Sequence, residues 1–387
     1  MTKYKLIRVT TVPESFGLLE GQLRFLAQFF DTLLVSSGRE ELSKIGLKEG
    51  VRTRSLNLTR LMSPINDLVC IFRFCCIIYE EKPNIVHSHT PKAGLVAMTS
   101  AWLMRVDHRV HTVAGLPLVK FSKKSFKGRL LRFVERWISY CATDVLPNSY
   151  KLRDFMIVNE LVRKSKTTVL GFGSSNGIDT SYFDPDLFDI ITVQKFRNKL
   201  SIQGKFVYTY IGRIVRDKGI HELICAFSRM LELKQDIILL VVGYFEDKYD
   251  PIDENVKDFI INNESVRYVG FQSDVRPYLA SSNVFVFPSY REGFPNAVLQ
   301  AASMNLFSIV TDINGCNEII VDGVNGKIIP VQNSDVLFDC MLDSYNNFNS
   351  IKIVENSNRN TIINKFNRKF VWTQYLQFYN NLLEIEI

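Results

Sequence analysis

The chain has 387 residues, of which 46% are hydrophobic and 22% are charged. These shares are typical of a soluble protein with a well-packed interior, and the length predicts two domains of similar size. The seven cysteines include no Cys-x-x-Cys pair and no histidine at zinc spacing, which predicts buried thiols in a reducing compartment. No apolar signal core follows the start MTKYKLIRVTTV, and no apolar run reaches the roughly 18 residues of a membrane span. The sequence therefore predicts a cytoplasmic protein.

Basic residues are concentrated in the first half of the chain. The net charge of +7 is the sum of +13 for residues 1–175 (27 basic, 14 acidic) and −6 for the remainder (20 basic, 26 acidic). A basic half predicts an anionic partner for that half, such as a membrane surface, a phosphate-bearing substrate or nucleic acid.

The first half alternates short apolar segments with helical stretches. Strands are predicted at residues 5–11, 32–36, 109–113 and 144–147 and in a segment that ends at residue 89, with helices at 20–30, up to 81, at 92–104 and near 128–142. Strands that alternate with helices predict right-handed βαβ units around a parallel sheet.

A turn-rich segment at residues 171–179 interrupts this alternation and suits an interdomain linker. The alternation resumes with strands at 206–212, 237–242, 267–269, 284–287 and 308–311, with helices at 221–233, 275–280 and 296–304, and with polar helices to the end. We expect an α/β protein with two doubly wound domains and a ligand cleft between them, at the carboxyl ends of the strands. The predicted boundaries are 1–172 for the first domain, 173–186 for the linker, 187–366 for the second domain, and 367–387 for a C-terminal helix that packs back on the first domain.

The end of the strand at 206–212 carries groups suited to a diphosphate. Gly212-Arg213-Ile-Val-Arg-Asp-Lys218-Gly219 lies immediately before a helix. The glycines let the backbone approach an anion, a guanidinium offers a bidentate fork, and an ammonium offers a point charge. Arg213 and Lys218 are therefore candidate diphosphate ligands, although a solvated basic turn explains this loop equally well when it is taken alone.

The strand at 284–287 leads into a loop that carries Glu292. There a carboxylate can reach the hydroxyls of a ligand, while the N–H groups of Gly293 and Phe294 and the helix start at Asn296 favour a phosphate. The alternative is a capping acid on a tight turn.

Together these segments resemble glycosyltransferase family 4. The resemblance rests on Arg213 and Lys218, on Ser-Tyr-Arg-Glu-Gly-Phe-Pro-Asn-Ala-Val-Leu-Gln at 289–300, on a linker-like segment at 176–185 and on residues 312–326. It spans nearly the whole chain. It implies a retaining enzyme of the GT-B fold, with two Rossmann-like domains facing each other across a cleft, a nucleotide-sugar donor, no cofactor and no metal.

The resemblance also assigns roles to residues in the second half. Arg213 and Lys218, with Gly212 beside them, would bind the donor diphosphate, and Glu292 would bind the donor sugar. Gly293, Phe294 and Asn296 belong to the same donor site. Where the family pattern has a second Glu for the ribose hydroxyls, this chain has Gln300. An amide still accepts from one hydroxyl and donates to another, but it brings no charge.

Three histidines lie at strand ends in the first half. His111 matches the family's histidine that faces the donor sugar, and the alternative is a satisfied core histidine. We expect His87 to pack and His89 to line the acceptor side. No acid or thiol stands at a matching spacing, so no metal site is predicted. Gly17, in the loop after the first strand, corresponds to the family's glycine-rich turn near the donor phosphate.

A basic amphipathic segment spans residues 120–137, with Phe126, Leu130, Phe133, Val134 and Trp137 available for one face. It predicts adsorption to an anionic membrane leaflet, where each basic residue near the surface contributes about 1 kcal/mol. The residues expected to face the acceptor or the membrane are His89, Lys92, Lys120, Lys123, Lys124, Lys127, Arg129, Arg132 and Trp137. Alternatively, the segment is a solvated basic face over a core-packed stripe, or binds nucleic acid, for which no recognition module is visible.

Residues 89–94 and 115–117 most resemble the family members that extend lipid-linked sugars for bacterial O-antigen, capsule or protein glycosylation. The resemblance implies transfer from a UDP-sugar, with an N-acetylhexosamine such as GalNAc expected, to an undecaprenyl-diphosphate-linked sugar at the inner face of the cell membrane. Two alternatives remain open. The first is a nucleotide-sugar epimerase on the same scaffold, which the Glu292 loop argues against. The second is a non-catalytic subunit that binds a nucleotide-sugar, which Gln300 motivates.

Overall fold

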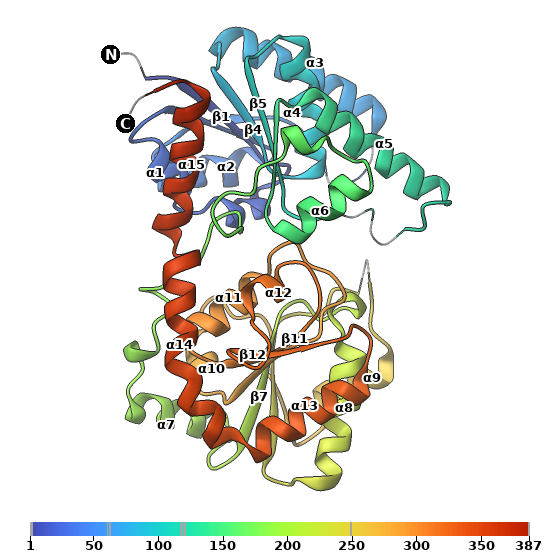
Figure 1. Cartoon of the computed structure of the whole chain (residues 1–387), viewed down its shortest axis with the longest axis vertical. Coiled ribbons are helices and arrows are strands. Elements are labelled where there is room, and N and C mark those ends of the chain that lie inside the picture. Colours follow the sequence, from blue (N-terminus) through green and yellow to red (C-terminus); the bar gives the residue numbers. More distant parts are fainter. Residues whose placement is uncertain are drawn as a thin grey trace. The chain divides into compact units, whose positions relative to one another are not determined.

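The computed structural model describes residues 3–385 except 60, 62, 117, 119, 120, 248 and 249, and the side chains of residues 351–358 are not described. The chain divides into two compact units, Met1–Asn176 with Arg368–Ile387, and Gly177–Asn367. Each unit is a six-stranded parallel sheet with helices packed against it (Figure 1). The predicted α/β class with two doubly wound sheets is therefore confirmed.

The first unit contains the sheet β3-β2-β1-β4-β5-β6. Its strands are β1 (Lys5–Val9), β2 (Asp31–Ser36), β3 (Arg52–Ser55), β4 (Ile85–Ser88), β5 (His108–Val113) and β6 (Asp144–Pro147). Its helices are α1 (Gln22–Leu26), α2 (Arg39–Glu49), α3 (Pro64–Glu81), α4 (Pro91–Leu103), α5 (Phe126–Cys141), α6 (Tyr150–Val158) and α15 (Arg368–Leu382), with the short 3-10 helices η1 (Pro13–Leu18) and η3 (Lys164–Lys166).

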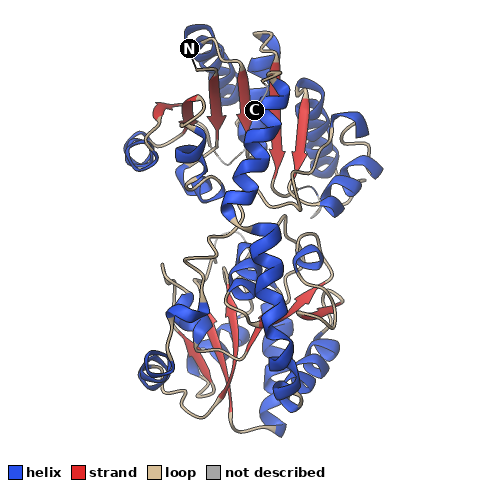
Figure 2. Cartoon of the chain, turned by 60° about the vertical axis from the view of Figure 1, so that its left-hand side comes forward, coloured by secondary structure: helices blue, strands red, loops and turns tan. Residues whose placement is uncertain are grey.

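Both faces of this sheet are covered by helices. Alternate residues of β1 point to opposite faces, so Ile7 packs with the core under α3, α4 and α5, whereas Leu6 packs with Tyr375 and Tyr379 of α15. The last helix of the chain thus completes the core of the first unit, and Figure 2 shows it crossing one face of that sheet.

Arg8 on β1 is fully buried beneath α15. Its guanidinium donates to Nε2 of His89 (2.8 Å), to the hydroxyl of Tyr379 (2.9 Å) and to Oε1 of Gln22 (2.5 Å). All three acceptors are neutral groups. Because a buried charge is costly unless its hydrogen bonds are satisfied, the bond to Tyr379 ties α15 to β1.

The structure corrects the expectation for His89, whose ring is buried and used by Arg8 instead of lining an acceptor surface. His87 packs as expected, with hydrogen bonds to Tyr379 (2.5 Å) and Thr112 (2.7 Å). Burial, reinforced by neighbouring positive charge, holds the pKa of both rings well below the ordinary value. Both histidines are therefore neutral at physiological pH.

The second unit contains the sheet β12-β11-β10-β7-β8-β9. Its strands are β7 (Phe206–Ile211), β8 (Ile237–Val242), β9 (Val266–Tyr268), β10 (Val284–Phe287), β11 (Phe307–Thr311) and β12 (Gly326–Ile329). Its helices are α7 (Ile190–Lys199), α8 (Ile220–Leu233), α9 (Glu254–Asn262), α10 (Arg276–Ala280), α11 (Asn296–Ser303), α12 (Cys316–Ile319), α13 (Ser334–Asn346) and α14 (Phe348–Phe366), with η4 (Pro185–Leu187) and η5 (Arg216–Lys218).

The strand order of this sheet decides which loops are neighbours. β8 and β10 are continuous apolar runs because helices bury both of their faces. β10 pairs with β7 on one side and β11 on the other, all in parallel. The loops that leave the carboxyl ends of these three strands therefore emerge side by side, as ligand loops do in doubly wound sheets.

None of the helices in the described part of the chain is long and apolar enough to cross a membrane.

Replacing Tyr379 with Phe tests how firmly α15 is held. The change removes the hydroxyl that accepts from Arg8 and contacts His87, and a buried polar group left without its partner costs about 1–3 kcal/mol. We expect the free energy of unfolding, measured with urea, to fall by about that amount. Tyr140→Phe is the control, because Tyr140 is 59% exposed. Equal stability of the two variants would contradict this account of Arg8.

Candidate active site

The loop after β7 brings Arg213 and Lys218 against the end of β10. Gly219, the N-cap of α8, has φ +70°, and a Cβ added there would lie 2.0 Å from the carbonyl oxygen of Pro288. Only glycine permits this approach. The backbone of Asp217 then accepts from the N–H of Tyr290 at 2.8 Å. The two loops predicted separately from the sequence are thus in direct contact.

Lys218 forms an ion pair with Glu292, and both side chains are largely buried, with 14% and 16% exposed. The hydroxyl of Ser289 donates to the same Glu292 oxygen at 3.0 Å. The Lys218 ammonium also lies 5.3 Å from the ring centroid of Phe287, the last residue of β10. Lys218, which is predicted to bind the donor diphosphate, and Glu292, which is predicted to bind the donor sugar, therefore neutralise each other.

Arg213 likewise has an acidic partner, Glu246, in the segment that follows β8. The Arg213 side chain remains 46% exposed. The backbone carbonyl of Arg213 accepts from the buried hydroxyl of Tyr210 at 2.7 Å. The backbone of this residue is thus fixed from below while its guanidinium remains partly open to solvent.

The glycines of the site allow close backbone contacts. Gly212 follows β7, and a Cβ on Gly243 would lie 1.8 Å from the Gly212 carbonyl oxygen. Gly293 is buried, and its carbonyl would lie 2.8 Å from a Cβ on Gly315, which has φ +78°. The loops after β7, β8, β10 and β11 therefore form one packed assembly.

Helix α11 begins at Asn296 after the N-cap Pro295. Asn296 is exposed and Gln300 is half-buried, four residues further along the same face. Phe294 packs instead against Phe366, with ring centroids 5.3 Å apart. The N-terminus of α11 thus offers backbone N–H groups beside Glu292, and the amide of Gln300 lies one turn behind.

Sequence reasoning did not single out the residues that support these loops. Arg291 donates to the carboxylate of Asp217 at 2.6 and 2.9 Å, and Tyr290 donates to Glu222 at 2.7 Å. Glu246 was also missed. A search for opposite charges on loops that follow neighbouring strands would have found Asp217 and Arg291.

His111, in the first unit, lies near the carboxyl end of β5 and is 2% exposed. Its Nδ1 is 2.8 Å from the hydroxyl of Ser88. A Cβ added to Gly94 would lie 2.5 Å from the imidazole ring, so glycine lets α4 pack directly on it. Burial lowers the pKa of His111 to about 4. The ring is therefore a neutral hydrogen-bonding group at physiological pH, and its role toward a donor sugar stays a prediction.

Gly17 lies in the 3-10 helix η1, and a Cβ there would meet nothing within 4 Å. Gly21 follows with φ +77°, packed on Trp372 of α15. No close approach therefore requires glycine at position 17, and its assignment to a phosphate turn stays a prediction.

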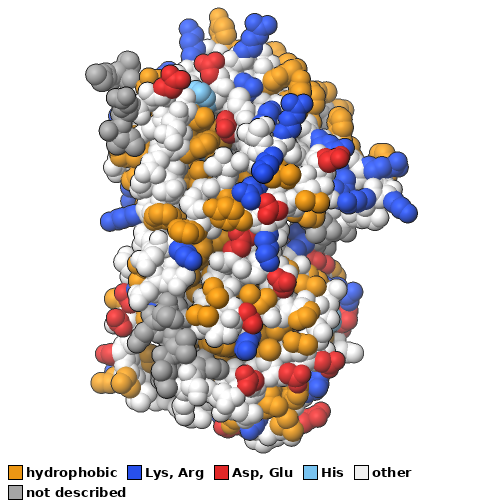
Figure 3. Space-filling view, in the orientation of Figure 1, with side chains coloured by type: hydrophobic (Ala, Val, Ile, Leu, Met, Phe, Trp, Pro, Cys, Tyr) orange, Lys and Arg blue, Asp and Glu red, His pale blue; other side chains and the backbone are white. Residues whose placement is uncertain are grey.

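Four predicted basic residues are exposed around the start of α5: Lys123, Lys124, Lys127 and Arg129. We call them the basic end of α5, and Figure 3 shows Lys and Arg side chains gathered there. Arg132 is half-buried and donates to Asn159 at 3.4 Å. Lys120 lies outside the described residues.

Lys92 and Trp137 differ from the expectation of a membrane-facing surface. Lys92 is only 9% exposed and pairs with Asp67 at 2.6 Å. Trp137 is half-buried and donates its indole N–H to Thr99 at 3.0 Å. Both side chains lie in the contact between α3, α4 and α5, where they bond to polar groups of the neighbouring helices.

Helix α5 also borders an apolar cavity of about 760 Å³ in the first unit. Glu135 lines this cavity and is 5% exposed. Burial raises the pKa of Glu135 to about 7.

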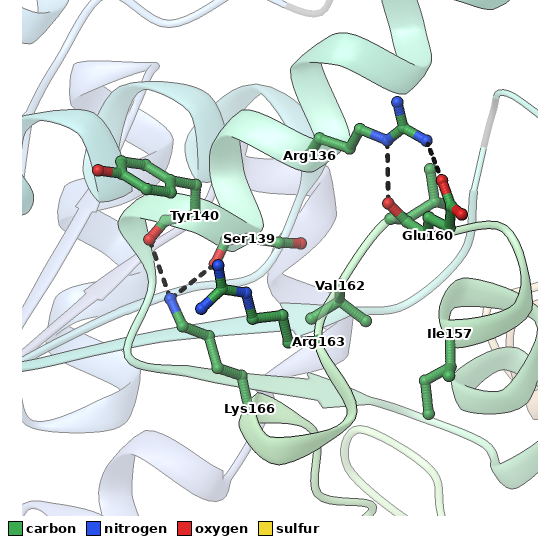
Figure 4. Close-up of a pocket in the computed structure, with 9 residues that line it drawn as sticks. Arg136, Ser139, Tyr140, Ile157, Glu160, Val162, Arg163 and Lys166 are labelled. Carbon is green, nitrogen blue, oxygen red and sulfur yellow. Dashed lines mark hydrogen bonds and ion pairs between the residues drawn. The ribbon is translucent and has the colours of Figure 1, made fainter.

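A separate basic cluster surrounds a cavity of about 550 Å³ between α5 and α6 (Figure 4). Lys166 donates to the carbonyls of Ser139, Tyr140 and Ala142 at 2.6–3.2 Å. Arg136 pairs with Glu160 at 3.2 Å. These cations hold carbonyls at the end of α5 and an acidic side chain, so the cluster has a structural role.

Comparison with known proteins agrees with this geometry. A family profile described as "Glycosyl transferase 4-like domain" matches residues 24–173, and one described as "Glycosyl transferases group 1" matches residues 205–347. The capsular polysaccharide biosynthesis glycosyltransferase CapM of Staphylococcus aureus is 32% identical over 385 residues, covering 99% of each chain. The UDP-Gal:alpha-D-GlcNAc-diphosphoundecaprenol alpha-1,3-galactosyltransferase of Escherichia coli is 27% identical, covering 95% of this chain and 94% of the relative.

The crystal structure of Anabaena Alr3699/HepE in complex with UDP has a similar fold, with a TM-score of 0.81. It covers 97% of this chain and all of the other at 16% identity. Two doubly wound sheets of this kind are the architecture of the GT-B glycosyltransferases. The chain belongs to glycosyltransferase family 4 and is a glycosyltransferase.

Replacing Glu135 with Gln tests the buried carboxyl group. Since the folded-state pKa is raised from 4.5 to about 7, the folded protein binds more protons than the unfolded chain in this window, and stability falls as pH rises through it. We expect E135Q to match the parent protein below pH 4.5 and to exceed its stability above pH 7 by about 1–3 kcal/mol, because one pKa unit corresponds to about 1.4 kcal/mol.

Urea unfolding at both pH values measures this difference. Glu40→Gln is the control, because Glu40 is exposed at the start of α2. A stability difference between E135Q and the parent that stays constant with pH would show that the carboxyl group titrates normally.

Proposed function

We propose that this protein is a retaining, metal-independent glycosyltransferase that moves a sugar from a UDP-sugar to a sugar carried on undecaprenyl diphosphate. The observation that carries the proposal is the convergence of Arg213, Lys218 and Glu292 on loops at the carboxyl ends of neighbouring strands. The names of two relatives support it, since one describes capsular polysaccharide synthesis and the other a diphosphoundecaprenol-linked sugar.

The donor diphosphate would displace the two carboxylates that are paired with Arg213 and Lys218. Lys218 is paired with Glu292, and Arg213 is paired with Glu246. A diphosphate brings at least two negative charges, so it is a stronger partner for both cations than a single carboxylate. Once Lys218 turns to the phosphate, Glu292 becomes free to accept from hydroxyls of the donor sugar.

These groups then favour departure of the nucleotide. In the transfer step, the bond from the anomeric carbon to the diphosphate oxygen breaks, and its electron pair leaves with the diphosphate. A bond from an acceptor hydroxyl forms on the same face, and the hydroxyl proton passes to the departing diphosphate. Arg213, Lys218 and the N-terminus of α11 stabilise the negative charge that develops on the leaving group.

The donor sugar is the finer part of the proposal. We infer an N-acetylhexosamine such as GalNAc, transferred in α linkage for O-antigen or another surface polysaccharide. Galactose is the alternative that the name of the Escherichia coli relative favours. The enzyme would act peripherally at the inner face of the cell membrane, where the basic end of α5 meets anionic lipids.

A donor-by-acceptor assay tests the reaction. Purified protein receives UDP-GalNAc, UDP-GlcNAc or UDP-Gal, each with a synthetic lipid-diphosphate-GlcNAc, and the products are separated by mass. We expect a disaccharide lipid with one donor, formed also in the presence of EDTA. UDP binding without any product would favour the non-catalytic subunit, and interconversion of UDP-sugars without acceptor would favour the epimerase.

Arg213→Ala and Lys218→Ala should each lower kcat by about 10²–10³, the usual cost of removing one group that stabilises transition-state charge. Arg216→Ala is the matched control, because Arg216 lies on the same loop but pairs with the exposed Asp253. We expect Arg216→Ala to retain activity within about threefold. Equal losses in all three variants would indicate a general loop defect and contradict the specific roles.

Gln300→Glu tests the departure from the family pattern. A carboxylate accepts charge-assisted hydrogen bonds, which are roughly twice as strong as neutral ones. If position 300 meets the ribose, Gln300→Glu should tighten UDP binding several-fold in isothermal titration, and Gln300→Ala should weaken it. Unchanged affinity in both variants would remove residue 300 from the donor site.

A further inference from the structure

The apolar cavity of the first unit lies among α3, α4 and α5. Its lining includes Ile71 of α3, Leu95 of α4, and Leu131 and Val134 of α5. Protein interiors contain few voids larger than a water molecule, whereas ligand pockets occupy roughly 300–1,000 Å³. A volume of about 760 Å³ therefore has the size of a binding pocket, not of a packing defect.

One end of the cavity lies at the edge of the sheet where ligands bind. Thr11 follows β1 and Thr90 follows β4, and both line the cavity. Their hydroxyl oxygens are 2.5 Å apart. Because β1 and β4 are neighbours with parallel direction, these residues mark the carboxyl edge of the sheet. The cavity thus leads from that edge into the space between the helices.

An exposed apolar surface continues the cavity along α3. Ile65, Leu68, Val69 and Phe72 lie on one face of the helix and are 43–81% exposed; we call them the α3 stripe. Leu68 belongs to both the stripe and the cavity lining. Contiguous exposed apolar side chains mark contact sites for apolar partners.

Charge lies at one end of this apolar path. The basic end of α5 begins the same helix whose Leu131 and Val134 line the cavity. Among the described residues that line the cavity, Lys92 is the one cation, and it is neutralised by Asp67. Burial raises the pKa of Glu135 to about 7, which favours the neutral form of its carboxyl group. The site therefore combines an apolar interior with a cationic approach, which suits a hydrocarbon chain attached to an anionic head group.

We propose that the cavity binds the isoprenoid chain of a lipid-diphosphate acceptor and that the α3 stripe extends this contact. The proposal rests on the proposed function, because that function supplies a substrate with an anionic diphosphate and a long hydrocarbon chain. A second copy of this chain is a poorer occupant, since it would bring its own basic end of α5 into the same region and the like charges would repel.

Binding of short isoprenoid lipids tests the cavity without any reaction. Isothermal titration compares a 15-carbon isoprenyl diphosphate with inorganic diphosphate, on the full chain and on Ile71→Trp and Leu131→Trp, which fill the cavity from two different helices. Leu47→Trp is the control, because Leu47 is 83% exposed on α2. Thermal melting of each variant verifies that it folds.

We expect the isoprenyl diphosphate to bind at least tenfold more tightly than diphosphate to the parent protein and to Leu47→Trp. Both filling variants should lose about tenfold in affinity for the isoprenyl diphosphate while keeping their affinity for diphosphate. Equal affinities of the two ligands for the parent protein overturn the proposal, and so does undiminished isoprenyl binding in both filling variants. Light scattering tests whether a second copy of this chain occupies the cavity. A dimer that both filling variants dissociate also overturns the proposal.

Transfer assays separate this inference from the proposed function. Acceptors with the same diphosphate-sugar head group but short or long chains are compared, and we expect the filling variants to lower kcat/KM about tenfold for the long chain only. If the parent protein transfers to neither acceptor but binds the isoprenyl diphosphate in the cavity, the proposed function fails and the lipid site stands. If both acceptors react equally well with every variant, the lipid site fails and the proposed function stands.

Discussion

The ion pair between Lys218 and Glu292 is the interaction on which the second unit's site depends. It joins the loop after β7 to the loop after β10, and both side chains are largely buried. Removing two charges from water is costly, and the pair offsets that cost only with good geometry and additional hydrogen bonds. The Ser289 hydroxyl supplies one of them. Each loop is therefore held in position by a charge that belongs to the other, before any ligand arrives.

The buried cation of the first unit, Arg8, is bonded to neutral groups instead of to a carboxylate. Arg8 is surrounded by His89, Tyr379 and Gln22, which are neutral acceptors. Neutral acceptors give an arriving anion no carboxylate to displace, and α15 closes over the guanidinium. Arg8 is thus fixed as part of the fold, whereas Lys218 pairs with a carboxylate, which is the partner that we propose the donor diphosphate replaces.

The sequence predicts the sheets well because buried parallel strands are continuous apolar runs, as in β8 and β10. It misses β3, whose residues Arg-Thr-Arg-Ser form an edge strand with no apolar signal. The site loops could be predicted from the sequence because glycines and charged residues follow those strands. Their partners Glu246 and Asp217 could not be predicted, because ion pairs between loops depend on which strands are neighbours in the sheet. His89 was misplaced because a histidine at a strand end has the same pattern whether it faces a ligand or a buried arginine.

Helix α5 shows how burial divides an amphipathic pattern. From the sequence alone, its basic and apolar residues predict a membrane-binding helix, with a solvated basic face over a core-packed stripe as the alternative. In the structure, Val134 and Trp137 turn inward toward α3 and α4, while Phe126 and Phe133 remain 75% and 65% exposed. Apolar area gains most where it leaves water completely, so residues within reach of the neighbouring helices pack against them. The cationic residues at the start of the helix have no such option, because an unpaired buried charge is too costly. The same helix therefore presents charge at its beginning and an apolar wall further along, which is the order of groups in a lipid diphosphate.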